Sequence, residues 1–204
     1  MAKRKGPLRN RKFKVTASRL RELGLLRASE RAASIKEGPW TMSGMYYISV
    51  VRVELDNGAT KEFVLKCPWD FTTEWLDNQF VTAKGRDWIT SFVNLQVKLS
   101  KEFRRIGVNA VRAEKYDKGT IIQENIGGHD FEATIRSLPP AKADELENKR
   151  REALHKIEAQ LHLVPVNRSY VTGHRIDVAS DFLVDEAGNP IVINFDFAGK
   201  NHHP

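Results

Sequence analysis

The stretch that decides the fold runs from residue 173 to residue 199 and reads GHRIDVASDFLVDEAGNPIVINFDFAG. Two short apolar runs in it, 182–184 and 191–193, flank the polar segment 185–190. Apolar runs of this length, separated by Asp, Gly, Asn and Pro, predict two strands joined by a turn. Acidic and amide side chains stand just outside both runs, so the stretch predicts a hairpin whose strands end in polar segments.

The sequence before this stretch predicts further strands and helices. β-Branched and aromatic residues on both sides of Asp56-Asn57-Gly58 predict a hairpin over residues 45–66, because Asn-Gly is a strong hairpin-turn signal. A second strand pair is expected at 111–115 and 120–124, and an irregular insertion at 67–84. Apolar spacings of three and four predict helices at 18–36 with Ser18 as N-cap, at 87–106 before Gly107, and at 141–163. Together these elements indicate an α+β protein.

Composition narrows the class of protein. Hydrophobic residues make up 41% and charged residues 29% of the chain, which is typical of a folded globular protein. No apolar run reaches the roughly 20 residues that a membrane-spanning helix needs, and no apolar stretch follows the basic start, so neither a membrane span nor a Sec-type signal peptide is expected. A single cysteine, Cys67, excludes an internal disulfide framework, and we expect it to be a small buried hydrophobe.

Positive charge is concentrated near the N-terminus. Residues 1–37 hold twelve Lys and Arg against three Glu, whereas the rest of the chain holds two more acidic than basic residues. Residues 1–14 are expected to be disordered in isolation. Two hypotheses stay open for residues 1–37. The first is salt-dependent contact with nucleic-acid phosphates. The second is a solubilising tail, or a loop that docks on the protein's own acidic surface. Phe13 is the one aromatic residue in this segment, so base stacking is not expected to contribute.

The chemistry-bearing motifs lie at the two ends of the predicted C-terminal hairpin. Residues 174–185, HRIDVASDFLVD, resemble the catalytic loop of protein kinases, H-x-D-x-x-x-x-N. Residues 193–199, INFDFAG, resemble the kinase D-F-G segment in the form D-F-D-[FW]-A-G of some atypical and small-molecule kinases. The resemblance covers about residues 40–199. It implies a protein-kinase-like two-lobed α+β fold with a basic N-terminal arm and short helix at 1–38, an N-lobe at 39–126 and a minimal C-lobe at 127–204.

The resemblance also implies roles for the residues of the two motifs. With His174 on the motif's histidine, the position of the catalytic base falls on Ile176, the metal-binding asparagine position on Asp181, and the D-F-G aspartate position on Asn194. Asp181 and Asn194 would therefore exchange the usual metal ligands while keeping one carboxylate and one amide around Mg²⁺, or Mn²⁺ in its place. A shift of the loop by one residue would make Asp177 the base, beside His174, and a similar slip would make Asp196 a metal ligand.

The nucleotide-binding residues follow from the same resemblance. Lys66 resembles the small-lobe lysine that reaches the α- and β-phosphates of ATP, with Glu102 as its partner on the following helix. Gly44 stands where kinases carry a glycine-rich loop over the phosphates. Residues Glu124 and Ile126 belong to the segment that resembles the hinge, whose backbone would meet the adenine.

The function that the resemblance implies is an ATP- and magnesium-dependent phosphotransferase acting on a protein or small-molecule hydroxyl. The alternatives are a pseudokinase or nucleotide-binding scaffold, and a nucleic-acid-binding protein acting through residues 1–37. Because five residues follow Gly199, no activation segment is expected, as in minimal kinases among bacterial effectors or the compact archaeal kinase associated with tRNA modification. A partner protein would then supply the acceptor or complete the fold. We expect a cytoplasmic protein, or one delivered into a host cytosol; the oligomeric state stays open.

Overall fold

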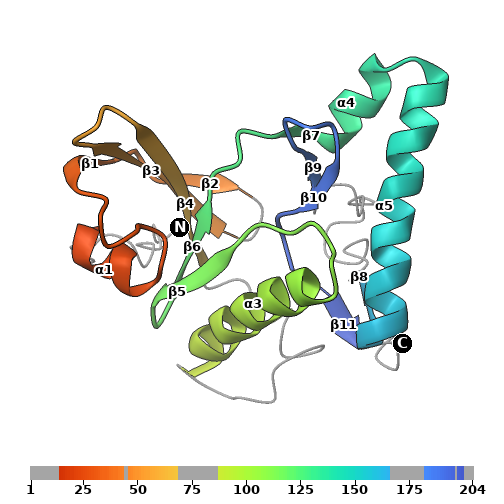
Figure 1. Cartoon of the computed structure of the whole chain (residues 1–204). Helices are drawn as coiled ribbons and strands as arrows, with labels where there is room; N and C mark the ends of the chain where they lie inside the picture. The colour runs from red at the N-terminus through yellow and green to blue at the C-terminus, as the bar shows by residue number, and fades with distance from the viewer. Residues whose placement is uncertain (1–13, 44–45, 69–86, 166–181, 196, 200–204) are drawn as a thin grey trace, which may run out of the picture. The chain divides into compact units, whose positions relative to one another are not determined.

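The computed structural model describes residues 14–43, 46–68, 87–165, 182–195 and 197–199. These residues form two compact units, here called the first and the second unit. The first comprises Met1–Val93 and Glu114–Asn125, and the second comprises Asn94–Ala113 and Ile126–Pro204. Both contain helices and antiparallel strands, so the protein is α+β (Figure 1). One boundary between the units falls between Asn125 and Ile126, and the helix over 87–105 is divided between them; the expected segments 1–38, 39–126 and 127–204 stay predictions.

The first unit is built on one sheet with the strand order β1-β3-β4-β6-β5, to which the short β2 adds by pairing with β3. Its strands are β1 (Ala32–Glu37), β2 (Thr41–Ser43), β3 (Tyr46–Leu55), β4 (Thr60–Pro68), β5 (Ala113–Asp117) and β6 (Thr120–Glu124). The predicted hairpin over 45–66 is confirmed as β3 and β4, with Gly58 at φ +81° in its turn. A positive φ favours glycine, which is why Asn-Gly is a good hairpin signal. The predicted pair 111–115 and 120–124 is confirmed as β5 and β6, with β5 beginning two residues later.

The predicted helix over residues 18–36 is wrong beyond its first turns. Helix α1 (Ala17–Glu22) begins at Thr16, whose hydroxyl accepts a hydrogen bond from the backbone N–H of Arg19, so Thr16 and not Ser18 is the N-cap. Gly24 has φ +65° and helps to end the helix. The second half of the predicted helix is strand β1, because its backbone pairs with β3. In this pairing Glu37 lies opposite Val51 and Ala32 lies opposite Leu55. Tertiary pairing has overridden a weak helical pattern.

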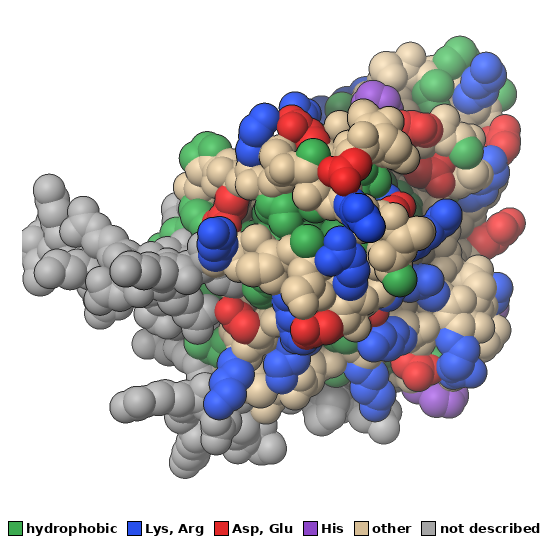
Figure 2. All heavy atoms as spheres, turned by 60° about the vertical axis from the view of Figure 1, so that its left-hand side comes forward, with side chains coloured by type: hydrophobic (Ala, Val, Ile, Leu, Met, Phe, Trp, Pro, Cys, Tyr) green, Lys and Arg blue, Asp and Glu red, His purple; other side chains and the backbone are tan. Residues whose placement is uncertain are grey.

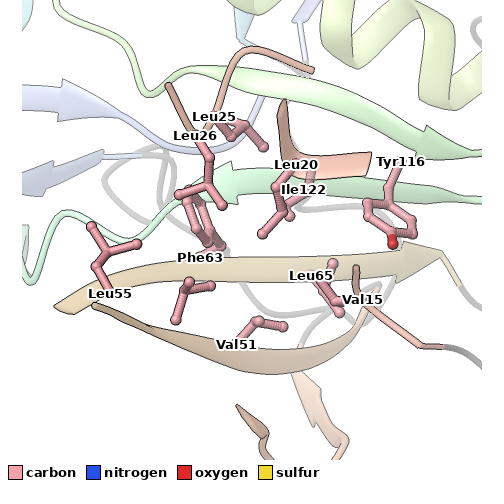
Figure 3. Close-up of a cluster of buried hydrophobic side chains, with 11 residues drawn as sticks. Val15, Leu20, Leu25, Leu26, Val51, Leu55, Phe63, Leu65, Tyr116 and Ile122 are labelled. Carbon is pink, nitrogen blue, oxygen red and sulfur yellow. The ribbon is translucent and has the colours of Figure 1, made fainter. Parts of the chain in front are cut away.

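The described N-terminal residues pack into the core of the first unit. Figure 3 shows their side chains facing those of the sheet and of Tyr116. The buried cluster consists of Val15, Leu20, Leu25, Leu26, Val51, Val53, Leu55, Phe63, Leu65, Tyr116 and Ile122. Arg19 donates hydrogen bonds to the backbone carbonyls of Lys115 and Tyr116 on the edge strand β5. Residues 14–37 are therefore a folded part of the first unit, and the expectation of a separate arm now concerns only the residues before Lys14, which lie outside the described ones.

The charges of the described N-terminal residues are partly matched within the first unit. Lys36 pairs with Glu54 at 2.9 Å, and Glu30, from the same segment, pairs with Lys61 of β4 at 2.8 Å. On the face drawn in Figure 2, Lys and Arg side chains are interspersed with Asp and Glu side chains. This arrangement fits the hypothesis that the segment docks on the protein's own surface.

The second unit contains most of helix α3 and all elements after residue 126. They are α3 (Asp87–Arg105), β7 (His129–Asp130), α4 (Phe131–Ser137), α5 (Pro140–Leu161), β8 (Leu163–Pro165), β9 (Phe182–Val184), β10 (Pro190–Val192) and β11 (Phe197–Gly199). The predicted helix over 87–106 is confirmed as α3, which ends before Gly107 at φ +72°. The predicted hairpin is confirmed as β9 and β10, and these strands form a sheet in the order β10-β9-β7, while β8 and β11 pair with each other. The sequence had not predicted β7, α4, β8 or β11.

Helix α5 is the longest described element of the second unit, and it contacts one strand of each sheet, β8 and β10 (Figure 1). It begins with Pro140 in its first turn, where the missing proline N–H is not needed, and ends at His162, which adopts the left-handed conformation with φ 55°. The predicted helix over 141–163 is thus confirmed with an end two residues earlier. Leu146 and Ile157 are the residues of α5 that are buried. None of the helices in the described part of the chain is long and apolar enough to cross a bilayer.

We predict that Leu20→Ala lowers the free energy of unfolding by about 3 kcal/mol, because it removes a fully buried side chain and leaves a cavity in the cluster of the first unit. Urea denaturation followed by circular dichroism measures the change. Leu23→Ala, at a half-buried neighbouring position, is the control and should cost clearly less. Equal losses for the two variants would show that the N-terminal segment does not contribute to the core as described.

Candidate functional site

Two strand pairs of the second unit frame the chain segment that carries Asn194. Phe182, the first residue of β9, pairs with Val192 of β10, and Pro165, the last residue of β8, pairs with Phe197 of β11. The undescribed stretch 166–181 thus leaves from a strand paired with residue 197 and returns to a strand paired with residue 192. Asn194 therefore lies between two paired strands, β10 before it and β11 after it in the chain.

Helix α3 holds this segment through the side chain of Gln96. The amide nitrogen of Gln96 donates to the backbone carbonyl of Phe195 at 3.0 Å, and its amide oxygen accepts from the backbone N–H of Phe195 at 3.3 Å. Gln96 is only 3% exposed, so these polar groups would be costly to bury without each other. Both hydrogen-bonding groups of the Phe195 backbone are thereby satisfied by one side chain, which sets the position of the residue between Asn194 and Asp196.

The same face of α3 carries two further contacts. Phe103, seven residues after Gln96, meets the Phe195 ring edge-on at a centroid distance of 5.6 Å. Ser100 lies between them, and its hydroxyl donates to the carbonyl of Val111 at 2.7 Å and accepts from the N–H of Ala113 at 3.0 Å. Positions 96, 100 and 103 recur at helical spacing, so one buried stripe of α3 holds both the Asn194 segment and the chain that follows α3.

Asn194 is the one predicted metal ligand that the structure describes. It follows strand β10 by two residues, is half-buried, and lies next to Phe195, which is 1% exposed. Its amide oxygen is a hard donor of the kind that Mg²⁺ accepts. The two hydrogen bonds between the Gln96 side chain and the Phe195 backbone, here called the clamp, fix the backbone next to Asn194. A fixed backbone is a favourable property for a metal-ligand position.

The remaining residues of the predicted catalytic and metal site lie outside the described residues. They are His174, Asp177, Asp181 and Asp196. Within the described part of the chain, no three His, Cys, Asp or Glu side chains are grouped so that they could hold a metal ion. The roles expected of these four residues stay predictions.

Lys66 lies in the first unit on β4, the middle strand of the order β1-β3-β4-β6-β5. Its backbone pairs with Ile48 of β3 and Ile121 of β6, and the residue is only 6% exposed. The ammonium group lies 5.7 Å from the centroid of the Tyr46 ring, which itself lies 6.1 Å from the ring of Phe92 on α3. Lysine side chains are rarely buried in proteins, and this one is buried inside β4, two residues before the strand ends at Pro68.

The other residues expected to bind nucleotide have different surroundings. Glu102 is in the second unit and forms an ion pair with Arg105 at 2.8 Å, so its carboxylate already has a cationic partner, and the pairing with Lys66 stays a prediction. Glu124 is the exposed last residue of β6, and Ile126 is half-buried at the start of the second unit. Gly44 lies outside the described residues, although its neighbours Ser43 and Tyr46 are paired between β2 and β3.

Sequence reasoning missed Gln96, Ser100 and Phe103 as residues that organise the candidate site. Phe103 was expected on the apolar face of the helix, but Gln96 and Ser100 were not singled out. The signal that could have found them is their spacing: Gln96 and Ser100 follow Phe92 by four and eight residues, which puts both polar residues on the apolar side of the predicted helix. A polar side chain on such a face either reaches solvent at the edge of the apolar face or forms hydrogen bonds in the protein interior. Only the tertiary structure distinguishes these two cases.

Comparisons with known proteins give a likeness of fold and no family. No family model matches the chain, and no curated protein matches it in sequence. Among solved structures, the chain is similar to a protein chain in the complex of Rv3197 with erythromycin from Mycobacterium tuberculosis, with 15% sequence identity and a TM-score of 0.53. The match covers 91% of this chain and 53% of that one, so the chain spans about half the length of its structural neighbour. At this identity the likeness concerns the fold alone.

We predict that Gln96→Leu lowers the free energy of unfolding by about 2–4 kcal/mol, because it leaves the buried N–H and C=O of Phe195 without their partner. Amide hydrogen exchange should show faster exchange at Phe195 than in the unaltered protein. Gln160→Leu, the same change at an exposed position of α5, is the matched control and should alter neither quantity noticeably. Unchanged exchange at Phe195 in Gln96→Leu would contradict the clamp.

Proposed function

We propose that the protein is an ATP- and Mg²⁺-dependent phosphotransferase with a two-lobed, kinase-like arrangement of its catalytic elements. The observation that carries the proposal is the strand frame around Asn194. In it, Phe182 pairs with Val192, and Pro165 pairs with Phe197. The catalytic-loop-like motif, 174–185, includes β9, and the D-F-G-like motif, 193–199, directly follows β10, the strand with which β9 pairs.

Chain connectivity extends this argument to the proposed metal ligands. Asp181 immediately precedes Phe182, and Asn194 follows Val192 by two residues. Phe182 and Val192 are paired between β9 and β10, so both proposed ligands are close in sequence to one described strand pair. We therefore propose that the carboxylate of Asp181 and the amide oxygen of Asn194 would hold Mg²⁺, which prefers oxygen ligands. Asp196 is the alternative to Asn194 on the same clamped segment.

Lys66 supports the proposal from the first unit. The kinase-like resemblance puts the phosphate-binding lysine on the strand that precedes the long helix of the small lobe. Here Lys66 is buried on β4, α3 is the next described element along the chain, and β6, which pairs with β4, leads into the hinge-like residues Glu124 and Ile126. We assign the Lys66 ammonium to the α- and β-phosphates, Glu102 to its support, and Gly44 to the cover of the phosphates.

In the proposed reaction, the oxygen of an acceptor hydroxyl attacks the γ-phosphorus of ATP. The bond from the γ-phosphorus to the bridging oxygen breaks, and ADP leaves with its phosphates beside the Lys66 ammonium. Mg²⁺ held by Asp181 and Asn194 would supply further positive charge there. The hydroxyl proton passes to the carboxylate of Asp177, with His174 shaping the same loop. If Asp177 cannot accept the proton, the protein would bind nucleotide without transferring phosphate, which is the pseudokinase alternative.

The acceptor is a hydroxyl of a protein or of a small molecule. Because the similar Rv3197 structure is a complex with erythromycin, we include erythromycin among the small-molecule acceptors to be screened. We further propose that a partner protein presents the acceptor when the acceptor is a protein. We place the reaction in the cytoplasm, or in a host cytosol, where ATP and Mg²⁺ are supplied.

We predict that ATP with Mg²⁺, at about a hundred times the dissociation constant, raises the melting temperature by about 5–10 °C. Lys66→Met should abolish most of this shift and lower transfer of labelled γ-phosphate by about 10²–10³-fold, because a cation at the phosphates is lost while the aliphatic stem is kept. Asp181→Ala should lose the part of the thermal shift and of the phosphate transfer that requires Mg²⁺. Lys61→Met, on the same strand and paired with Glu30, is the matched control and should retain both binding and transfer.

The outcomes separate the alternatives. A thermal shift that depends on Lys66, without label transfer to the protein, to lysate proteins or to erythromycin, would identify a nucleotide-binding pseudokinase. Neither shift nor transfer with Mg²⁺ or Mn²⁺ would exclude the proposed phosphotransferase.

A further inference from the structure

The second unit contains a pocket that the proposed reaction does not use. It has a volume of 470 Å³, which lies within the range of about 300–1,000 Å³ typical of small-molecule sites. Its walls come from the loop after α3, from one face of α5 and from the turn between β9 and β10. The lining residues are Gly107, Val108, Asn109, Lys149, Glu152, Ala153, Lys156, Asn189 and Pro190. None of them belongs to the residues assigned to nucleotide or metal.

Two lysines of α5 mark the ends of this pocket. Lys149 and Lys156 are seven residues apart, so they lie on one helix face and about 10 Å apart along the axis. The ammonium of Lys149 donates to the side-chain oxygen of Asn189 at 3.3 Å and pairs with Glu145 at 3.0 Å. The ammonium of Lys156 donates to the backbone carbonyl of Gly107 at 3.3 Å, and among the described residues it has no carboxylate partner.

Gly107 allows the second of these contacts. A Cβ atom at this position would lie 3.0 Å from the Lys156 ammonium, closer than side chains normally approach, so a larger residue would displace the lysine. The backbone at Gly107 also has φ +72°, a conformation that favours glycine. The loop is therefore shaped to admit the Lys156 ammonium against its carbonyl oxygen.

The wall between the two lysines is held in place and offers acceptors. Asn109 donates to the carboxylate of Asp185 at 3.0 Å and to the carbonyl of Pro190 at 3.2 Å, and the same carboxylate accepts from the N–H of Asn189 at 2.8 Å. These bonds join the loop after α3 to the turn of the β9–β10 hairpin without the help of a ligand. Glu152, between the lysines on α5, has no hydrogen-bond or ion-pair partner among the described residues, so its carboxylate is open to a hydroxyl donor.

We propose that this pocket binds a small polyol that carries a phosphate at each end, of the sugar-bisphosphate class. Each phosphate contacts one ammonium, Lys149 at one end and Lys156 at the other, and the hydroxyl groups between them donate to Glu152. Charge-assisted contacts at both ends favour two phosphates over one, and the middle carboxylate disfavours a ligand with anionic charge at its centre. The apolar atoms of Val108, Ala153 and Pro190 line the pocket against the carbon skeleton.

Isothermal titration of the full chain tests this proposal with three probes: fructose 1,6-bisphosphate, fructose 6-phosphate and inorganic phosphate. We expect the bisphosphate to bind at least about tenfold more tightly than the monophosphate, because a second charged contact is added. Lys149→Met and Lys156→Met should each weaken bisphosphate binding about tenfold, to the level of the monophosphate. Lys142→Met, at an exposed position of the same helix outside the pocket, is the matched control and should bind like the unaltered protein.

Any of three results overturns the proposal. The bisphosphate does not bind, it binds no more tightly than inorganic phosphate, or Lys142→Met weakens its binding as much as Lys149→Met and Lys156→Met do. Lys66→Met distinguishes this pocket from the proposed nucleotide site. We expect Lys66→Met to bind the bisphosphate as the unaltered protein does. Loss of bisphosphate binding in Lys66→Met would place the ligand at the nucleotide site instead. Melting temperatures of all variants show whether they are folded, and bisphosphate binding that survives in a folded double variant, Lys149→Met with Lys156→Met, also contradicts the proposal.

Discussion

The paired hydrogen bonds between the Gln96 side chain and the backbone of Phe195 are the contact on which the candidate site depends. A primary amide offers one donor and one acceptor side by side, and the backbone of one residue offers the complementary pair. In a buried place neither partner can turn to water, so the pairing specifies one position of the segment relative to α3. The edge-on contact of Phe103 with Phe195 adds an apolar restraint to the same segment.

Two features of the first unit, its N-terminal segment and Lys66, contribute buried side chains although they carry positive charge. Leu20 and its neighbours cover the sheet, which makes a segment with many basic residues a part of the core rather than an appendage. Lys66 is buried on the middle strand, where its charge is placed beside the ring of Tyr46. The proposed phosphate contact gives this buried charge a role in nucleotide binding.

The second unit combines a frame for chemistry with a separate pocket, and both depend on the same short loops. Asp185 organises the β9–β10 turn through the N–H groups of Ala187 and Asn189, and reaches the loop after α3 through Asn109. The β9–β10 hairpin thereby has one end near the Asn194 segment and the other end in the wall of the lysine-lined pocket. The turn that the sequence marked with Asp, Gly, Asn and Pro is thus also a junction between elements.

The sequence by itself determined the elements with strong local signals. The hairpin at Asn57-Gly58, the helix that ends before Gly107, the helix that begins at Pro140 and the hairpin around 185–190 all follow from turn chemistry or helical spacing. Only the tertiary structure decided that residues 32–37 are a strand, that β8 meets β11, and that Gln96 holds Phe195. The physical reason is that these features consist of hydrogen bonds between distant residues: a backbone pairing with β3, a pairing across more than thirty residues, and a bond between positions 99 residues apart. Local propensity contains no information about such partners.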